Sequence, residues 1–194
     1  MRYWGVATIV LVSVTAASPV EAYNADHLQR LQETGNCQGC DLRQADLSEW
    51  DLSGADLSGA NLFGANLFKV NLQGANLNDA SFYRADLRRA TLTDAIATSA
   101  DFCRADLMEA DLDYALLDRA DLSQANLQRA NLENAILHEA NLQGARLVSA
   151  YLLNTDLRAA NLSGANLYQA DLAQAHTQLT IMDGAMMPHN ERYE

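Results

Sequence analysis

Residues Ala55 to Gly64 read Ala-Asp-Leu-Ser-Gly-Ala-Asn-Leu-Phe-Gly, and this five-residue unit decides the fold. The unit is a small residue, then Asp or Asn, then Leu, then two variable residues. At every fifth position from Leu42 to Leu172, 24 of 27 residues are Leu, and the others are Phe82, Ala97 and Phe102. Ala stands two residues earlier in 23 of the 27 units, and Asp or Asn stands between them in 20. The chain is therefore built from repeats with a period of five.

A period of five fits neither of the common secondary structures. On an α-helix successive Leu residues would rotate around the axis, and on a strand they would alternate between the two faces. The chain must instead turn once per repeat, so that every Leu and every Ala faces one interior. Asp and Asn suit such tight turns because their side chains bond nearby backbone groups. The sequence predicts a coil wound around its own core.

Departures from the unit recur at a spacing of 20 residues. Phe82 and Phe102 both replace Leu, and Ile96, Leu116 and Ile136 all replace Asp or Asn. Residues that stack on adjacent coils tend to match, so we predict four repeats per coil and about seven coils. At about 4.8 Å between stacked coils, the rod would be about 30 Å long.

The repeated Ala-Asp/Asn-Leu-X-X unit resembles the pentapeptide-repeat family over roughly three quarters of the chain after residue 22. The resemblance implies an all-β fold, a right-handed quadrilateral parallel β-helix. It also implies that Leu57 and Ala55 face inward, whereas Asp56, Ser58 and Gly59 face outward.

The first segment, residues 1–22, is predicted to be a signal peptide. Arg2 precedes an apolar run, and the small-residue pattern ending at Ala22 predicts cleavage between Ala22 and Tyr23. The apolar run is shorter than the roughly 20 residues that a membrane span needs, so no span is expected after cleavage. We therefore expect an exported protein, and the family resemblance allows the periplasm or the thylakoid lumen.

Three further segments are predicted. Residues 23–39 form an N-terminal helical cap, with Asp26 as N-cap, Leu28 and Leu31 on one side, and Gly35 as the helix stop. Residues 40–174 form the repeat solenoid. Residues 175–194 form a degenerate last coil and a C-terminal cap or tail.

Cys37 and Cys40 have three interpretations: a local disulfide, two free thiols, or a metal or redox site. The pair follows the predicted helix and faces its negative end, which does not favour a reactive thiolate. A zinc site would need two further ligands. We predict the disulfide, and the other two readings stay open. Cys103, at an outward position, leaves an intermolecular bridge, and hence a homo-oligomer, open.

The formal net charge of −12 disfavours binding to nucleic acid, which attracts Lys and Arg. The sequence contains no Gly-rich phosphate loop and no nucleophile beside a base, and the predicted interior is filled. We therefore predict no enzymatic activity, no catalytic residues, and no cofactor or metal site.

Two sets of outward-facing apolar residues are candidate binding sites for an unknown protein partner. Ile96, Leu116 and Ile136 should form a stripe along one side of the rod, which is either an interface or the floor beneath a loop or terminal segment. The second set is Phe63, Phe68 and Tyr83, which could anchor a partner or could simply be exposed apolar residues. The leading prediction is an exported, non-enzymatic structural and protein-interaction protein with a rigid β-helical surface.

Two other functions remain open. Some members of the resembled family mimic DNA and bind DNA gyrase, and the acidity of this chain is compatible with that role. The signal peptide opposes it, as do six arginines in the middle of the rod: Arg84, Arg88, Arg89, Arg104, Arg119 and Arg129. The third function is redox or metal handling by Cys37 and Cys40.

Overall fold

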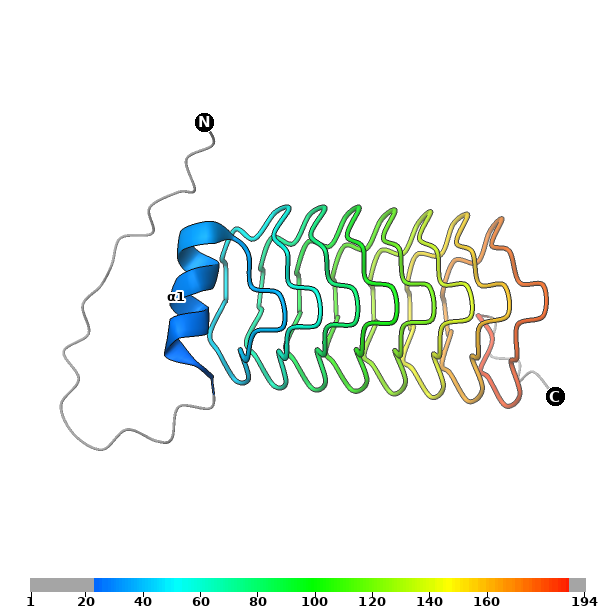
Figure 1. The fold of residues 1–194 in the computed structure, drawn as a ribbon. Helices are drawn as coiled ribbons and strands as arrows, with labels where there is room; N and C mark the ends of the chain where they lie inside the picture. Colours follow the sequence, from blue (N-terminus) through cyan, green and yellow to red (C-terminus); the bar gives the residue numbers. More distant parts are fainter. Residues whose placement is uncertain (1–22, 189–194) are drawn as a thin grey trace.

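The computed structural model describes residues 23–188 and shows a rod of stacked coils with one helix, α1 (Ala25–Thr34), at its N-terminal end (Figure 1). The predicted signal peptide and its Ala22 lie outside the described residues. In the described part the coils are joined by single-residue parallel β-bridges rather than by longer strands. Each bridge joins residues 20 apart, from Asn36↔Asp56 to Asn166↔Met186. The 20-residue coil of four repeats is therefore confirmed.

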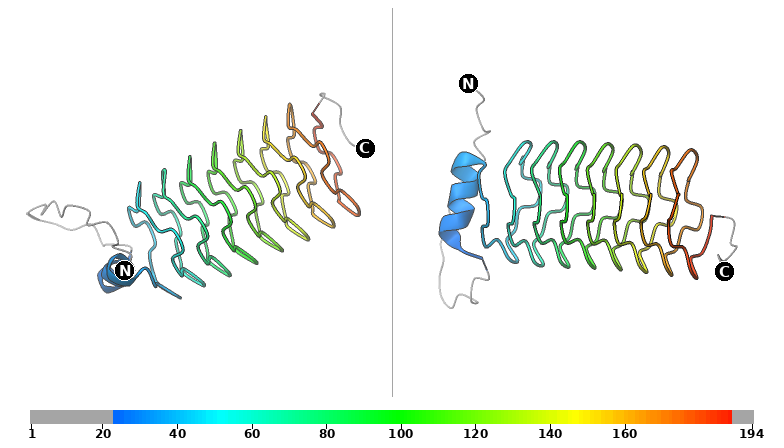
Figure 2. Two further views of the ribbon diagram at one scale, coloured as in Figure 1. Left: turned by 90° about the horizontal axis from the view of Figure 1, so that it is seen from above. Right: turned by 45° about the vertical axis from the view of Figure 1, so that its right-hand side comes forward.

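Each coil has four sides, and each repeat supplies one side and the turn that follows it. We number the sides by their bridge residues: face 1 (41, 61 and on to 181), face 2 (46 to 186), face 3 (51 to 171) and face 4 (36 to 176). Two further views show that the coils stack in register along the rod (Figure 2). Residues 20 apart in the sequence are consequently neighbours on the surface.

The backbone of a typical repeat explains why Asp or Asn precedes the Leu. Within repeat 121–125, two N–H groups donate to the next coil, one donates to the previous coil, and that of Ala125 closes a turn on the Leu122 carbonyl at 3.0 Å. The fifth N–H, that of Ser123, donates to the side chain of Asp121 at 2.9 Å. All five donors are satisfied, and the Asp or Asn side chain supplies the one acceptor that the stacked backbone lacks.

Each turn spans four residues, from the Leu to the following Ala, and its third residue has a positive φ, as a type II turn requires. Gly59 adopts φ 64° without strain, but Arg89 at the equivalent place has φ 59°. The hydrogen bonds between coils hold residues other than glycine in this conformation.

The interior is filled by the Leu and Ala positions. Leu57 and Ala55 are at most 1% exposed, as expected for inward-facing residues. Phe82 and Phe102 stack on each other with ring centroids 4.8 Å apart. Each buried Leu adds about 1.5 to 3 kcal/mol, and the gain is realised only when coils stack on both sides.

Helix α1 covers the N-terminal end of the rod, but its N-cap is Asn24 and not Asp26 (Figure 1). The Asn24 side chain accepts hydrogen bonds from the N–H groups of Asp26 and His27. Asp26 lies instead in the first turn, where its charge complements the helix dipole. The predicted stop is confirmed, because Gly35 ends the helix with φ 66°. Leu31 is 1% exposed.

Beneath α1, Cys37 occupies the Leu position of the first bridged repeat, and Cys40 occupies the Ala position that opens the next. Both are buried, and their sulfur atoms lie at disulfide distance, 2.06 Å apart. The pair thus fills the end of the core as Leu and Ala do elsewhere.

The C-terminal end is more open. Leu172 is partly exposed and Leu179 is 87% exposed, whereas Met182 is 8% exposed and Met187 packs against the core. Within residues 23–188, no helix has the length and apolar character needed to cross a membrane.

Candidate protein-interaction surface

Ile96, Leu116 and Ile136 lie on three consecutive coils of face 4. β-Bridges join Ile96 to Leu116 and Leu116 to Ile136, so neighbours are about 4.8 Å apart. Ile96 is 39% exposed and the other two side chains are partly buried. The structure brings the three residues together as one continuous apolar stripe.

The stripe departs from the hydrogen bonding of most other repeats, as do the single repeats with Ser81, Thr91, Arg146 or Tyr151 at the same position. On the same face, Asp156 accepts from the N–H of Arg158 at 3.1 Å. Leu116 and Ile136 offer no acceptor, and within residues 23–188 the N–H groups of Asp118 and His138 have no protein partner. The apolar side chains therefore remove a backbone acceptor without filling the core. Within residues 23–188 the stripe is set apart because three consecutive coils carry an apolar residue at this position, and departures from a local rule are expected at functional surfaces.

Tyr114 extends the stripe and was not anticipated from the sequence. It is 55% exposed, two residues before Leu116, on the turn that ends face 3. Its place in the chain could have indicated this, because a turn residue just before an apolar bridge residue borders the same surface. We call Ile96, Leu116, Ile136 and Tyr114 the stripe patch.

The second predicted set is divided between two faces. Phe63 and Tyr83 stack on face 1 with ring centroids 5.7 Å apart, whereas Phe68 lies on face 2. The guanidinium of Arg84 lies 5.3 Å from the Tyr83 ring, and that of Arg88 lies 5.6 Å from the Phe68 ring. These rings are partly covered by cations of the same chain, which favours the stripe patch as the binding surface.

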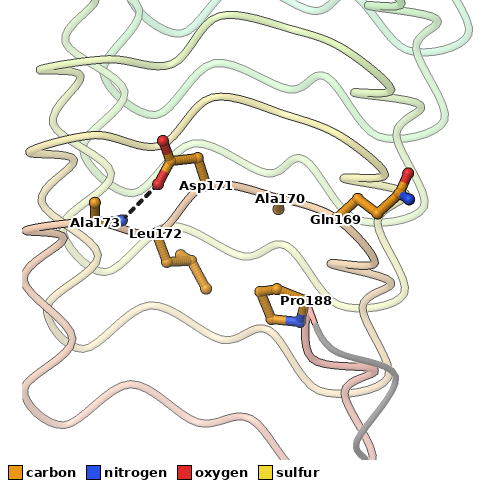
Figure 3. Close-up of a pocket in the computed structure, with 6 residues that line it drawn as sticks. All are labelled: Gln169, Ala170, Asp171, Leu172, Ala173 and Pro188. Atoms are coloured by element: carbon orange, nitrogen blue, oxygen red, sulfur yellow. Dashed lines mark hydrogen bonds between the residues drawn. The ribbon is translucent and has the colours of Figure 1, made fainter.

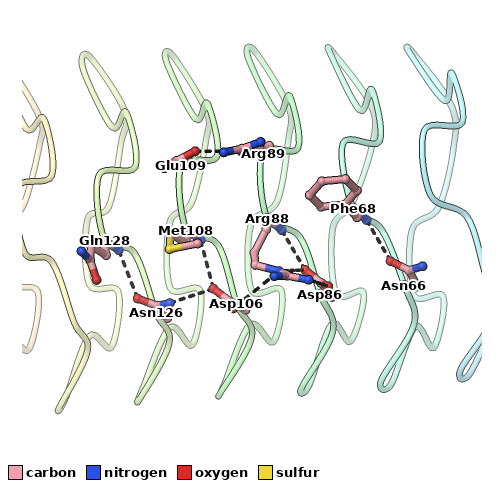
Figure 4. A network of polar contacts seen from close by, with 10 residues as sticks. All are labelled: Asn66, Phe68, Asp86, Arg88, Arg89, Asp106, Met108, Glu109, Asn126 and Gln128. Atoms are coloured by element: carbon pink, nitrogen blue, oxygen red, sulfur yellow. Dashed lines mark hydrogen bonds and ion pairs between the residues drawn. The ribbon is translucent and has the colours of Figure 1, made fainter.

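Many of the charged side chains on face 2 pair with one another (Figure 4). Arg88 donates to Asp86 at 2.6 and 2.8 Å and approaches Asp106 at 3.8 Å, while Arg89 pairs with Glu109 on the next coil at 2.8 Å. The hydrogen bond from Arg88 holds the pKa of Asp86 below its ordinary value. Exposed pairs of this kind add little to stability, because solvent screens them.

Asp101, Cys103 and Asp121 form a small cluster on face 1 that the sequence analysis missed. Their potential ligand atoms lie within 4.8 Å of one another, and all three residues are partly exposed. The 20-residue spacing of the two aspartates was the signal that could have found it. Exposed carboxylates of this kind commonly hold no ion, so the cluster is assigned no metal.

A shallow depression of about 450 Å³ lies at the C-terminal end (Figure 3). Its lining residues are Gln169, Ala170, Asp171, Leu172, Ala173 and Pro188. The carboxylate of Asp171 accepts from the N–H of Ala173 at 3.0 Å, and the lining places neither a base nor a nucleophile beside it.

Three solved structures illustrate what the chain is similar to. HetL, a pentapeptide repeat protein involved in heterocyst differentiation regulation in Nostoc sp. strain PCC 7120, is 38% identical over 81% of this chain and 78% of that chain, with a TM-score of 0.39. QnrB1, a plasmid-mediated fluoroquinolone resistance protein, is 22% identical over 70% of this chain and 80% of that chain, with a TM-score of 0.51. A pentapeptide repeat protein from the Arabidopsis thaliana thylakoid lumen is 26% identical over 72% of this chain and 66% of that chain, with a TM-score of 0.21.

The comparison with curated proteins gave no match. The family described as pentapeptide repeats matches in eight copies, over residues 36–67, 65–102, 85–124, 115–152 and 140–176. These overlapping matches cover the bridged coils almost from end to end. The chain therefore belongs to the pentapeptide-repeat family.

Proposed function

We propose that this protein is an exported, non-enzymatic scaffold that binds a protein partner on the stripe patch. One observation carries the proposal: Ile96, Leu116 and Ile136 expose apolar side chains on three consecutive coils, at the position whose side chain accepts a backbone hydrogen bond in most other repeats. The stacked hydrogen bonds fix the spacing of these side chains. The stripe patch would therefore lose little conformational freedom when a partner binds, which favours affinity.

A Leu116→Asn variant is expected to fold normally and to lose the partner. The new side chain can accept from the N–H of Asp118, as Asp and Asn do in the other repeats, so the unfolding free energy should change by less than about 1 kcal/mol. Loss of the central apolar side chain should weaken partner binding by at least about 10-fold. Urea unfolding measures the first quantity, and cross-linking measures the second. Arg146→Asn makes the same kind of change on face 2 and should leave cross-linking intact.

The cross-linking experiment uses p-benzoylphenylalanine in place of Tyr114, in cells that make the protein. A discrete adduct is expected that disappears when Leu116→Asn is added. Tyr168 is the matched control position, since it is 38% exposed but lies on face 2. Adducts that form equally from both positions, or that survive Leu116→Asn, would count against the stripe patch as the interface.

Export makes a separate prediction. The protein recovered from a periplasmic or lumenal fraction is expected to begin at Tyr23, because the Ala22–Tyr23 bond follows the predicted recognition pattern. Cell fractionation followed by N-terminal residue determination measures this, and the fraction distinguishes periplasm from lumen. Recovery from the cytoplasm with Met1 retained would refute export but would leave the proposal for the stripe patch unaffected.

A further inference from the structure

Charge is distributed very unequally around the rod. The face 3 repeats contain no Lys or Arg and six acidic residues: Asp51, Asp94, Asp111, Asp113, Glu133 and Asp171. Face 4 carries five acidic residues and two arginines, whereas faces 1 and 2 together carry nine acidic and eight basic residues. Nearly all the net negative charge of the described coils therefore lies on faces 3 and 4, and the stripe patch lies along the corner between them.

The border of the stripe patch on the face 3 side is acidic. Asp94, Asp113 and Glu133 occupy the turns of three consecutive coils beside the stripe, with Tyr114 among them. In the described part of the chain none of these three carboxylates forms an ion pair with Lys, Arg or His.

The border on the face 1 side contains one cation, and it is already engaged. Arg119 donates to Glu139 on the next coil at 2.8 Å, which leaves the neighbouring Asp118 as the uncompensated charge. Both borders of the stripe therefore present negative charge to an incoming partner.

We propose that the stripe patch binds a cationic amphipathic helix of the partner protein, lying along the rod axis. The proposal rests on the proposed function and adds the chemistry of the partner. One helical turn rises about 5.4 Å and one coil about 4.8 Å, so apolar residues on three successive helical turns would meet Ile96, Leu116 and Ile136 in order. Lys or Arg on one flank of that helix would then lie over Asp113 and Glu133.

The exposed ring of Tyr114 supports this assignment. Tyr114 follows Asp113 directly in the chain on the same turn. An aromatic ring and a carboxylate presented by one turn would together attract Lys and Arg through cation–π and ionic contacts. The carboxylates stay partly solvated, so their pairing costs little desolvation and mainly accelerates and orients association.

The same charge distribution limits the argument against DNA mimicry. Of the six central arginines, all but Arg119 lie on faces 1 and 2, so they do not interrupt the acidity of face 3. The stripe separates the two ideas, because an apolar ridge has no counterpart in the charged backbone of a DNA duplex. A helix-binding surface needs Leu116, and a DNA mimic does not.

The test uses the purified protein and three synthetic peptides of about 14 residues, or about four helical turns. The first peptide has Leu on one stripe and Lys along one flank, the second has Glu in place of every Lys, and the third has the composition of the first with the Leu residues scattered. Fluorescence anisotropy measures binding. The first peptide is expected to bind at least about 10-fold more tightly than the other two, with an affinity that falls as salt rises.

Variants then locate the site. Leu116→Asn and the double change Asp113→Asn with Glu133→Gln are each expected to weaken binding of the first peptide by about 10-fold. The matched control is Asp51→Asn with Asp171→Asn, which removes the same charge from face 3 on coils away from the stripe and should change binding by less than about 2-fold. Equal weakening by the control pair, or equal binding of the Glu peptide, would overturn the proposal.

Failure here is distinguishable from failure of the proposed function. If no peptide binds but the adduct at position 114 still depends on Leu116, the interface stands and the cationic helix is wrong. If the adduct is also absent, both are wrong. Inhibition of gyrase supercoiling that is unchanged by Leu116→Asn would assign the acidic faces to DNA mimicry and overturn the helix-binding assignment.

Discussion

A Phe102→Ala variant is expected to lose about 3 to 5 kcal/mol of unfolding free energy, the range for deleting a fully buried aromatic side chain. Phe102 is completely buried and its ring stacks on Phe82 on the previous coil. The lost ring would leave a cavity that its neighbours cannot fill, since the hydrogen bonds between coils hold the backbone in place. Because each coil is stabilised by its neighbours, a defect in the middle of the rod weakens the stack on both sides.

Urea unfolding followed by circular dichroism measures this loss. Phe102→Leu is the matched control, because it restores the commonest inward residue and keeps most of the buried volume. Its cost should stay below about 1.5 kcal/mol. An Ala variant that loses no more than the Leu variant would mean that the coils can collapse around the missing ring, and that the stack is less rigid than its hydrogen bonds suggest.

Sequence alone predicted the coil because an in-register parallel stack places like residues in contact. Phe82 and Phe102 illustrate this, since their 20-residue spacing appears in the structure as stacked rings. The same reasoning placed Ile96, Leu116 and Ile136 on one side of the rod, and the bridges between them confirm it. Period and spacing depend only on the order of residues along the chain, so they can be read from the sequence without knowing how the coil closes.

The helix start could not be fixed in this way, because a tertiary contact decides it. Asn24 and Asp26 are both good N-cap residues. The backbone N–H of Asn24 donates to the carbonyl of Asp41 at 3.0 Å, and the N–H of Asp41 donates to Nδ1 of His27 at 2.9 Å. Docking of the helix on the first coil holds Asn24 in an extended conformation, and the cap forms there.

The border of the stripe was missed for a related reason. Tyr114, Asp113 and Glu133 belong to repeats of face 3, and they meet a face 4 stripe only because the chain turns a corner after them. Spacing along one face does not describe contacts across a corner. The direction of each turn residue depends on its positive φ, which the residue type did not indicate at Tyr114.

A Leu31→Asp variant is expected to detach α1 from the first coil while the centre of the rod stays folded. Leu31 is 1% exposed, and a carboxylate placed there would lose several kcal/mol of docking free energy. A ten-residue helix is not stable by itself, so α1 should unfold once undocked. Hydrogen exchange should show lost protection in residues 24–60 and retained protection in residues 96–136.

The same variant should also associate, because the uncovered first coil would present unpaired backbone groups and apolar side chains, as an open sheet edge does. Light scattering after gel filtration is expected to show dimers or larger species, with Gln32→Asp as the matched control, since it adds the same charge on the exposed side of α1. A monomeric Leu31→Asp protein with a protected first coil would show that α1 is not the cap. If association does occur while the first basic peptide still binds as tightly as before, the N-terminal cap and the stripe patch act independently, as expected for a stack in which each coil contacts only its neighbours.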